Sequence, residues 1–264
     1  MAAEKTQALI LKVLPYRESS CILNLFTNEH GLVHGVAKGV KRKNKAATSL
    51  EHGFLSELML YHRPNREIHT IGAISLLNYY PSTITDLYKT VIRDLAFEVV
   101  MKTMSCDAAH PEVFSYLLDF CAHLESQPAA RCFPVMTWQF LFHFCRLMGV
   151  APSPDACAIC GRLLDNSDGA FLVTDLGCFR CAACATSLGK TNGFVPPPVM
   201  NSLQDKNTEP DNALISLLPP AEIKRLIRLF ARYCQYHFHS LHDYKSVDFI
   251  ESFLPASSME DVYG

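Results

Sequence analysis

Four cysteines occur as two Cys-x2-Cys pairs, a spacing that is typical of metal sites. "CAICG" supplies Cys157 and Cys160, and "CAAC" supplies Cys181 and Cys184 further along the chain. A gap of two residues lets both sulfurs of a pair reach the same ion, so two such pairs bring four thiolates to one tetrahedral Zn²⁺. Four sulfur ligands leave no open position for water. The spacing therefore predicts one structural zinc ion.

Two alternatives to this four-cysteine zinc site stay open. Cys178 lies three residues before Cys181 and could replace one of the ligands. The four paired cysteines could also be buried thiols that bind no metal. The other six cysteines lie on apolar runs and are expected to be small core residues. They are Cys21, Cys106, Cys121, Cys132, Cys145 and Cys234.

Motifs for catalysis are weak in this chain. "HPE" at 110–112 with "CAIC" loosely resembles the pattern of zinc nucleobase deaminases, but Ala156 stands where that pattern has Pro. His110 is better explained as the start of a helix, and "HFHSLH" at 237–242 as a helix end or an aromatic patch. There is no phosphate-binding Gly-x4-Gly-Lys loop and no Gly-x-Ser-x-Gly elbow. We therefore expect a protein that is not an enzyme.

Basic residues gather in the N-terminal third of the chain. The stretch "VAKGVKRKNKAAT" at 36–48 has no acidic residue, although the chain carries a formal net charge of -2. Residues 1–80 carry a net charge of +4 and the remainder carries -6. This asymmetry favours a local contact with a polyanion, and a solvated loop without a partner is the alternative. The five cations of the stretch are Lys38, Lys41, Arg42, Lys43 and Lys45.

Further cations and aromatic rings could extend such a contact. Cations would neutralise phosphates, and bases would stack on exposed rings. Core packing is the expected role of Phe26, whereas Tyr16 and Tyr61 are candidate stacking platforms. The additional cations are Lys12, Arg17, Arg63 and Arg66.

Up to about residue 80 the sequence predicts β-strands, and these strands must position the cations and aromatic rings. "TNEHG" predicts a hairpin between the second and third strands, and the longest gap, 39–53, contains the basic run. Five strands with this spacing predict a Greek-key barrel of the OB type, with an SH3-like barrel as its closest rival. The predicted strands lie at 7–13, 21–27, 31–38, 54–62 and 67–77.

After Pro81 the apolar residues recur with a helical period. The helix at 131–149 is apolar almost all round, so we expect it to be central and buried. Residues 150–193 are loop-rich and carry the cysteine pairs. The fold class is therefore α+β, with an OB-type barrel domain at 1–80 and a helical domain at 81–264 into which the zinc segment is inserted. The other predicted helices lie at 85–104, 110–126 and 219–241.

The last of these helices has a basic face that could hold DNA or the acidic tail of a partner protein. A solvated helix face is the alternative. Its cations are Lys224, Arg225, Arg228 and Arg232.

Composition gives the class and the expected compartment. The chain has 264 residues, of which 49% are apolar and 19% charged, and this balance is typical of a globular protein. No apolar run approaches the roughly 18 residues that span a bilayer, and the N-terminal segment has charges where a signal peptide has its apolar core. We expect a cytoplasmic protein whose cysteines are reduced or metal-bound.

Several motifs, in order, resemble the bacterial recombination mediator family RecO. They are the Tyr-x-Glu-Ser turn at 16–19, "FTNEHG" at 26–31, "AKG" at 37–39 with its basic residues, the segments "LMGVAPSPDACAICG" and "GCFRCAAC", and the tail "YKSVDFIESFL" at 244–254. The chain departs from the family in having Gly177-Cys178 where a Gly-Gly pair is usual. The family also includes members without zinc.

The resemblance implies a non-enzymatic DNA-repair protein of the bacterial cytoplasm, associated with the nucleoid. Such proteins bind single- and double-stranded DNA and anneal complementary strands. With RecR they help RecA replace single-strand-binding protein (SSB), whose C-terminal tail they contact through the helical domain. A transcription or translation accessory factor with an OB barrel and a zinc ribbon is the alternative function.

Overall fold

The computed structural model describes residues 3–40, 50–63, 66–164, 167–187, 189, 193–204, 218–243 and 245–253. Contacts divide the chain into two compact units, Met1–Ser126 and Gln127–Gly264. The boundary expected at residue 80 marks the change from strands to helices, whereas the compact units meet after Ser126. Within the described residues, no helix is long and apolar enough to cross a membrane.

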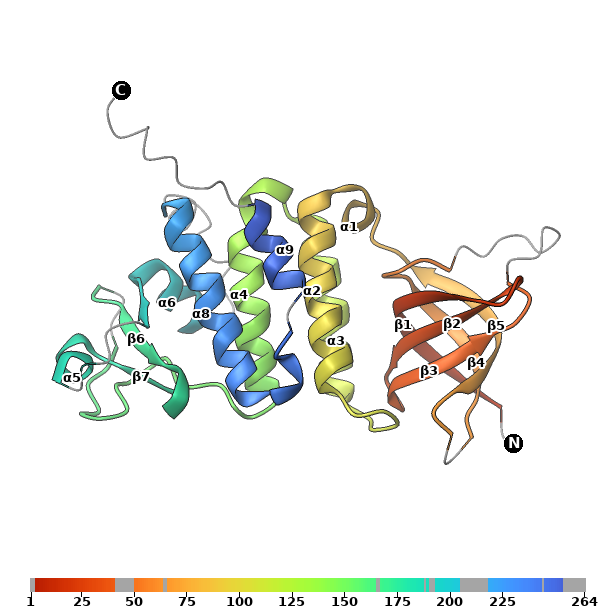
Figure 1. The fold of residues 1–264 in the computed structure, drawn as a ribbon, viewed down its shortest axis with the longest axis horizontal. Helices are drawn as coiled ribbons and strands as arrows, with labels where there is room; N and C mark the ends of the chain where they lie inside the picture. The colour runs from red at the N-terminus through yellow and green to blue at the C-terminus, as the bar shows by residue number, and fades with distance from the viewer. Residues whose placement is uncertain are drawn as a thin grey trace, which may run out of the picture. The chain divides into compact units, whose positions relative to one another are not determined.

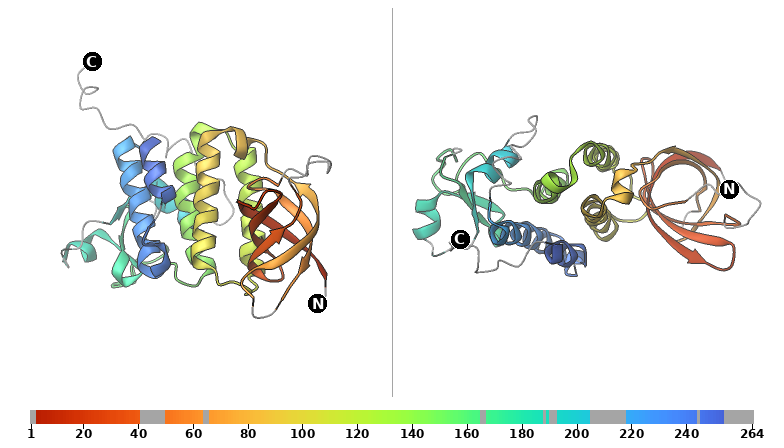
Figure 2. Two further views of the ribbon diagram at one scale, coloured as in Figure 1. Left: turned by 45° about the vertical axis from the view of Figure 1, so that its right-hand side comes forward. Right: turned by 90° about the horizontal axis from the view of Figure 1, so that it is seen from above.

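The first unit begins with a closed five-stranded barrel whose strand order is β1-β2-β3-β5-β4 (Figures 1 and 2). β3 and β5 are parallel and close the ring, and the other neighbours are antiparallel. This is the predicted OB-type barrel, and the hairpin of β2 and β3 is confirmed. The strands are β1 (Glu4–Tyr16), β2 (Ser20–Thr27), β3 (Gly31–Ala37), β4 (Leu55–Tyr61) and β5 (His69–Asn78).

The barrel interior is filled by the alternate apolar residues of its strands. Leu23 and Leu25 of β2 and Leu58 and Leu60 of β4 belong to this core. Because side chains of a strand alternate between its two faces, one residue in two points inward. In β1, however, the run Ala8–Leu11 is buried without alternation, because the strand carries a bulge between Ile10 and Lys12 and both of its faces are covered.

Three helices complete the first unit: α1 (Ser82–Thr85), α2 (Leu87–Thr103) and α3 (Pro111–Ser126). The Asp86 side chain accepts a hydrogen bond from the Lys89 backbone N–H and caps α2. Phe26 of β2 is fully buried, as expected, and its ring packs at 6.3 Å from that of Phe114 in α3. α3 therefore packs against the outer face of β2.

A partly buried polar network joins α1, α2 and α3. The Glu125 carboxylate accepts hydrogen bonds from the backbone N–H of Ser82 at 2.9 Å and from its hydroxyl at 2.6 Å. The Lys89 ammonium, which is 4% exposed, donates to the Ser82 hydroxyl and to the Glu125 carbonyl, each at 2.8 Å. The carboxylate thus caps the first turn of α1 and lies close to a buried cation.

Replacing Glu125 by Ala is expected to lower the free energy of unfolding by about 3 kcal/mol. Hydrogen bonds to charged groups contribute about 1.5–3 kcal/mol each, and Ser82 loses two of them. Urea unfolding followed by circular dichroism measures the change, with the exposed Glu112→Ala of the same helix as control. A loss below about 1 kcal/mol, equal to that of the control, would show that the network is not needed for stability.

The second unit is built on two long helices, α4 (Ala129–Leu147) and α8 (Pro220–His237). The rings of Phe142 and Phe230 meet at 6.4 Å, and the sulfurs of Cys145 and Cys234 lie 3.5 Å apart. The described side chains of α4 from Val135 to Phe142 are buried apart from Gln139. The prediction of a central buried helix is therefore confirmed for this part of α4.

The segment between these helices is more regular than the expected loop. It contains a three-stranded sheet of order β7-β6-β8 and the helices α5 and α6. Phe179 of β7 packs on Phe142 of α4, and the Gln204 side chain donates to the carbonyls of Pro154 and Leu164. The elements are β6 (Ala170–Val173), η1 (Thr174–Leu176), β7 (Cys178–Arg180), α5 (Ala182–Ser187), β8 (Phe194–Val195) and α6 (Pro197–Gln204), with η2 (His239–Leu241) and α9 (Lys245–Phe253) following α8.

Candidate metal centre and nucleic-acid interface

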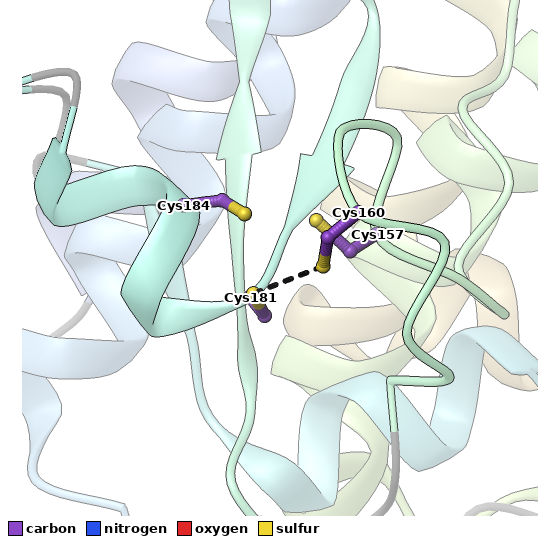
Figure 3. A group of neighbouring side chains, drawn as sticks. All are labelled: Cys157, Cys160, Cys181 and Cys184. Carbon is purple, nitrogen blue, oxygen red and sulfur yellow. Dashed lines mark hydrogen bonds between the residues drawn. The ribbon is translucent and has the colours of Figure 1, made fainter.

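The four cysteines of the two Cys-x2-Cys pairs come together in space. Their sulfurs all lie within 4.8 Å of one another and point toward a common centre (Figure 3). The sulfurs of Cys160 and Cys181 are 3.8 Å apart. A zinc ion with four sulfurs at about 2.3 Å requires sulfur–sulfur distances of about 3.8 Å in a tetrahedron. The donor set therefore fits a four-coordinate zinc ion.

Local backbone structure explains how each pair is presented. The first pair lies in a tight turn, in which the Gly161 N–H donates to the Cys157 carbonyl at 2.9 Å and Gly161 has a φ of +71°. The second pair starts at the end of β7, so that Cys184 falls on the first turn of α5. The Ala158 N–H donates to the Phe179 carbonyl at 3.0 Å and fastens the first turn to β7. The two pairs are therefore fixed next to each other by backbone hydrogen bonds.

The thiols of this cluster have unequal acidities. Burial acts to raise the pKa of Cys157, but N–H groups of Cys160, Cys181 and Ile159 outweigh it and lower that pKa to about 6. Hydrogen bonds with the Cys160 and Cys181 side chains raise the pKa of Cys184 to about 12. A cation that stabilises all four thiolates would release protons on binding, and its affinity would rise with pH.

Cys178 is not part of the four-sulfur group. It lies on β7. The pKa of Tyr233 on α8 is raised mainly by burial, then by the thiols of Cys145 and Cys234, and least by Cys178. The hydroxyl of Tyr233 donates to the Val150 carbonyl. This neighbourhood gives Cys178 a place beside α8, apart from the paired cysteines.

The predicted cations of the barrel do not all lie together. Lys38 directly follows β3 and is exposed, and Arg17 occupies the turn between β1 and β2. Both line one polar hollow of about 470 Å³. Lys41, Arg42, Lys43 and Lys45 lie outside the described residues.

Three other predicted cations lie elsewhere on the barrel. Arg63 and Arg66 belong to the connection of β4 and β5, which lies beside the start of β1. Arg17, in contrast, follows the end of β1. Lys12 is exposed on β1. The pKa of His52 is lowered to about 4, mainly by burial and then by Arg93, and Lys12 is close enough to add a smaller effect in the same direction. A strand of DNA that contacts all of these cations would have to run along the barrel.

The basic face of α8 is partly committed to contacts within the protein. The Arg225 guanidinium forms an ion pair with Glu222 and donates to the Phe194 carbonyl at 2.5 Å, which ties α8 to β8. Arg228 and Arg232 line a polar hollow of about 260 Å³ together with acidic residues of the following segment. Those acidic residues are Asp243 and Asp248. Lys224 is half-buried and also has an interaction within the chain.

Sequence reasoning missed a second cluster of metal-ligand residue types. Asp107 Oδ1 lies 3.1 Å from His62 Nε2 and 3.3 Å from His69 Nε2. The Arg63 backbone N–H donates to His69 Nδ1 at 3.1 Å, so a neutral His69 carries its proton on Nε2 and donates it to Asp107. Burial lowers the pKa of His69, which favours the neutral ring, although Asp107 acts in the opposite direction. This arrangement leaves His69 no lone pair for a metal, and the cluster holds the connection of α2 and α3 to the barrel.

The fold and the cysteine cluster define a class of protein: an OB-type barrel followed by a helical domain that carries a four-cysteine metal-type site. Two family models match this chain, Recombination protein O N terminal over residues 1–80 and Recombination protein O C terminal over residues 84–242. The chain therefore belongs to the Recombination protein O family of DNA repair proteins.

Curated relatives agree with this assignment. "DNA repair protein RecO" of Prosthecochloris aestuarii is 24% identical over 242 residues, which cover 88% of this chain and 91% of the relative. The protein of the same name from Syntrophobacter fumaroxidans is 29% identical over 182 residues, 69% of this chain and 71% of the relative. That from Geobacter metallireducens is 30% identical over 165 residues, 61% and 64% of the two chains.

Proposed function

We propose that this protein is a non-enzymatic mediator of homologous recombination in the bacterial cytoplasm, acting at the nucleoid. It binds single- and double-stranded DNA, anneals complementary strands and, with RecR, helps load RecA onto single strands coated with SSB. The observation that carries the proposal is the match of family models to both the barrel and the helical part. The exposed cations beside the polar hollow of the barrel support the DNA contact.

In this proposal the four-cysteine site holds one structural Zn²⁺. The ligands are Cys157, Cys160, Cys181 and Cys184, whose sulfur spacing suits a tetrahedral ion. The ion, when bound, neutralises thiolate charge and cross-links two backbone segments. It leaves no coordination position for a substrate.

For the acidic SSB tail, we propose the α8 surface around Arg228 and Arg232. Arg225, on the same helix, forms an ion pair with Glu222 and donates to the Phe194 carbonyl. Titration of a labelled SSB-tail peptide against Arg228→Gln and Arg232→Gln, with Arg162→Gln as a control at a surface ion pair, tests the site. Equal affinity for all three variants would remove α8 from it.

Strand annealing tests the proposed function itself. Complementary oligonucleotides coated with SSB are mixed with the purified protein over a series of salt concentrations, with and without RecR. A recombination mediator accelerates annealing, and the acceleration falls as salt rises because phosphate contacts release counterions. A transcription or translation accessory factor would leave the annealing rate at its spontaneous value, and that result would contradict the proposal.

A further inference from the structure

The polar hollow on the barrel lies where the β1–β2 turn meets the end of β3. Its volume of about 470 Å³ falls within the range of about 300–1,000 Å³ that small-ligand sites occupy. Tyr16 lines it from the end of β1 and Arg17 from the turn, and Lys38 and Gly39 line it from the residues that follow β3. The hollow thus brings an aromatic ring, two cations and turn backbone to one place.

Arg17 forms a flat platform in this hollow. Its guanidinium carbon lies 5.2 Å from the centre of the Tyr16 ring, so the ring supports the cation from one side. The backbone of Arg17 has a φ of +53°, a left-handed conformation that non-glycine residues rarely adopt and that has an energetic cost. Arginine planes, like aromatic rings, are surfaces on which unpaired bases stack. The turn therefore presents a planar cation, with an aromatic ring beside it, to the hollow.

Charges around the platform are suited to one nucleotide. Lys38 is exposed and offers a cation to a phosphate, while Glu18 lines the same hollow and repels one. A carboxylate at this place accepts instead from an exocyclic amino group, as acidic side chains do from cytosine N4. Two serines, Ser19 and Ser20, add hydroxyl groups to the lining.

We infer that this hollow binds a single unpaired nucleotide, with the base stacked on Arg17, its amino edge toward Glu18 and its phosphate at Lys38. The inference rests on the proposed function and assigns one contact with single-stranded DNA to this hollow. In a duplex, each base is stacked on both faces, so a duplex offers phosphates and base edges to the hollow but no face to stack on Arg17. Cytosine-containing single strands should bind better than thymine-containing ones, because thymine has no amino group for Glu18.

The test is fluorescence anisotropy of labelled oligo-dC, oligo-dT and a hairpin duplex with the full-length protein. Arg17→Lys keeps the charge and loses the plane, and Arg17→Asn removes the side chain while tolerating the left-handed backbone. Both variants are expected to bind oligo-dC about five- to tenfold more weakly, the low end of the effect of losing one stacked base. Arg17→Lys is expected to bind the duplex within twofold of wild type. Glu18→Ala, which removes the acceptor, is expected to abolish the preference for oligo-dC over oligo-dT.

Controls separate this inference from the proposed function. Lys5→Gln changes an exposed cation that pairs with Glu57, near the start of β1, and is expected to bind all three probes like the wild type. Wild-type affinity of both Arg17 variants for oligo-dC would overturn the nucleotide site and leave DNA binding intact. An equal loss for single strand and duplex in Arg17→Lys would overturn the stacking role. Failure of the wild-type protein to bind any probe would instead overturn the proposed function.

Discussion

Replacing Lys41, Arg42 and Lys43 together by Ala is expected to weaken the binding of single-stranded DNA about 100-fold at 0.1 M salt. Each neutralised phosphate on a single strand contributes about 0.7 to the slope of log affinity against log salt. Three lost contacts therefore lower the slope from about -3 to about -1 and remove a factor of about 10² at this salt concentration. Anisotropy titrations at several salt concentrations measure both quantities.

The position of the basic run supports this expectation. Val40 and Leu50, the described residues on either side of the run, pack against the barrel core together with Val13 and Ile74. The described residues before and after the run thus belong to the barrel, and Lys38 lines its polar hollow.

A control with the same change in net charge makes this result specific. Lys5, Lys102 and Arg162 each form an ion pair with a neighbouring carboxylate, and a triple Ala variant at these positions also removes three positive charges. Its affinity for DNA is expected to remain within about threefold of wild type, because distant charges are screened beyond about 10 Å at 0.1 M salt. Equal losses in both triple variants would assign the effect to net charge. An unchanged slope in the first variant would exclude the basic run as a contact.

The barrel was predictable because each strand follows a simple local rule. Alternating apolar residues between clear turn signals predict half-buried strands, and the long gap after the third strand indicates the OB connection. The packing of α3 against its outer face was not predictable, since it depends on pairs such as Phe26 and Phe114 that are distant in sequence. The sheet β7-β6-β8 was missed because strands of two to four residues carry too little periodicity.

For the candidate sites, sequence spacing predicted only those defined by local patterns. The two Cys-x2-Cys pairs carry their geometry in their spacing, and the structure brings their sulfurs together. His62 follows β4, His69 begins β5 and Asp107 lies in the connection of α2 and α3, and no sequence pattern joins them. The hydrogen bond from Arg225 to the Phe194 carbonyl was equally hidden, because a basic helix face does not indicate which cations already have partners within the chain.

Removing the metal is expected to unfold the cysteine-bearing segment and to leave the barrel folded. Structural zinc contributes about 10–16 kcal/mol of apparent binding free energy in small zinc domains. Here the segment is also held by the packing of Phe179 on Phe142 and by the hydrogen bond from Arg225 to the Phe194 carbonyl. We therefore expect the free energy of unfolding of the second unit to fall by a smaller amount, about 5 kcal/mol. Hydrogen exchange with and without a chelator shows which residues lose their protection. Metal analysis gives the zinc content, for which we expect one ion per chain.

Single replacements then decide the ligand set. Cys181→Ser leaves three sulfurs and is expected to lose most of the bound zinc at equilibrium with a competing chelator. Cys178→Ser is the matched control, three residues away and outside the four-sulfur group, and should keep one ion per chain. The cations of the barrel lie in the other compact unit, so chelation should change the affinity for single-stranded DNA less than twofold. Loss of zinc in Cys178→Ser, or full retention in Cys181→Ser, would mean that the four paired cysteines are not the ligands.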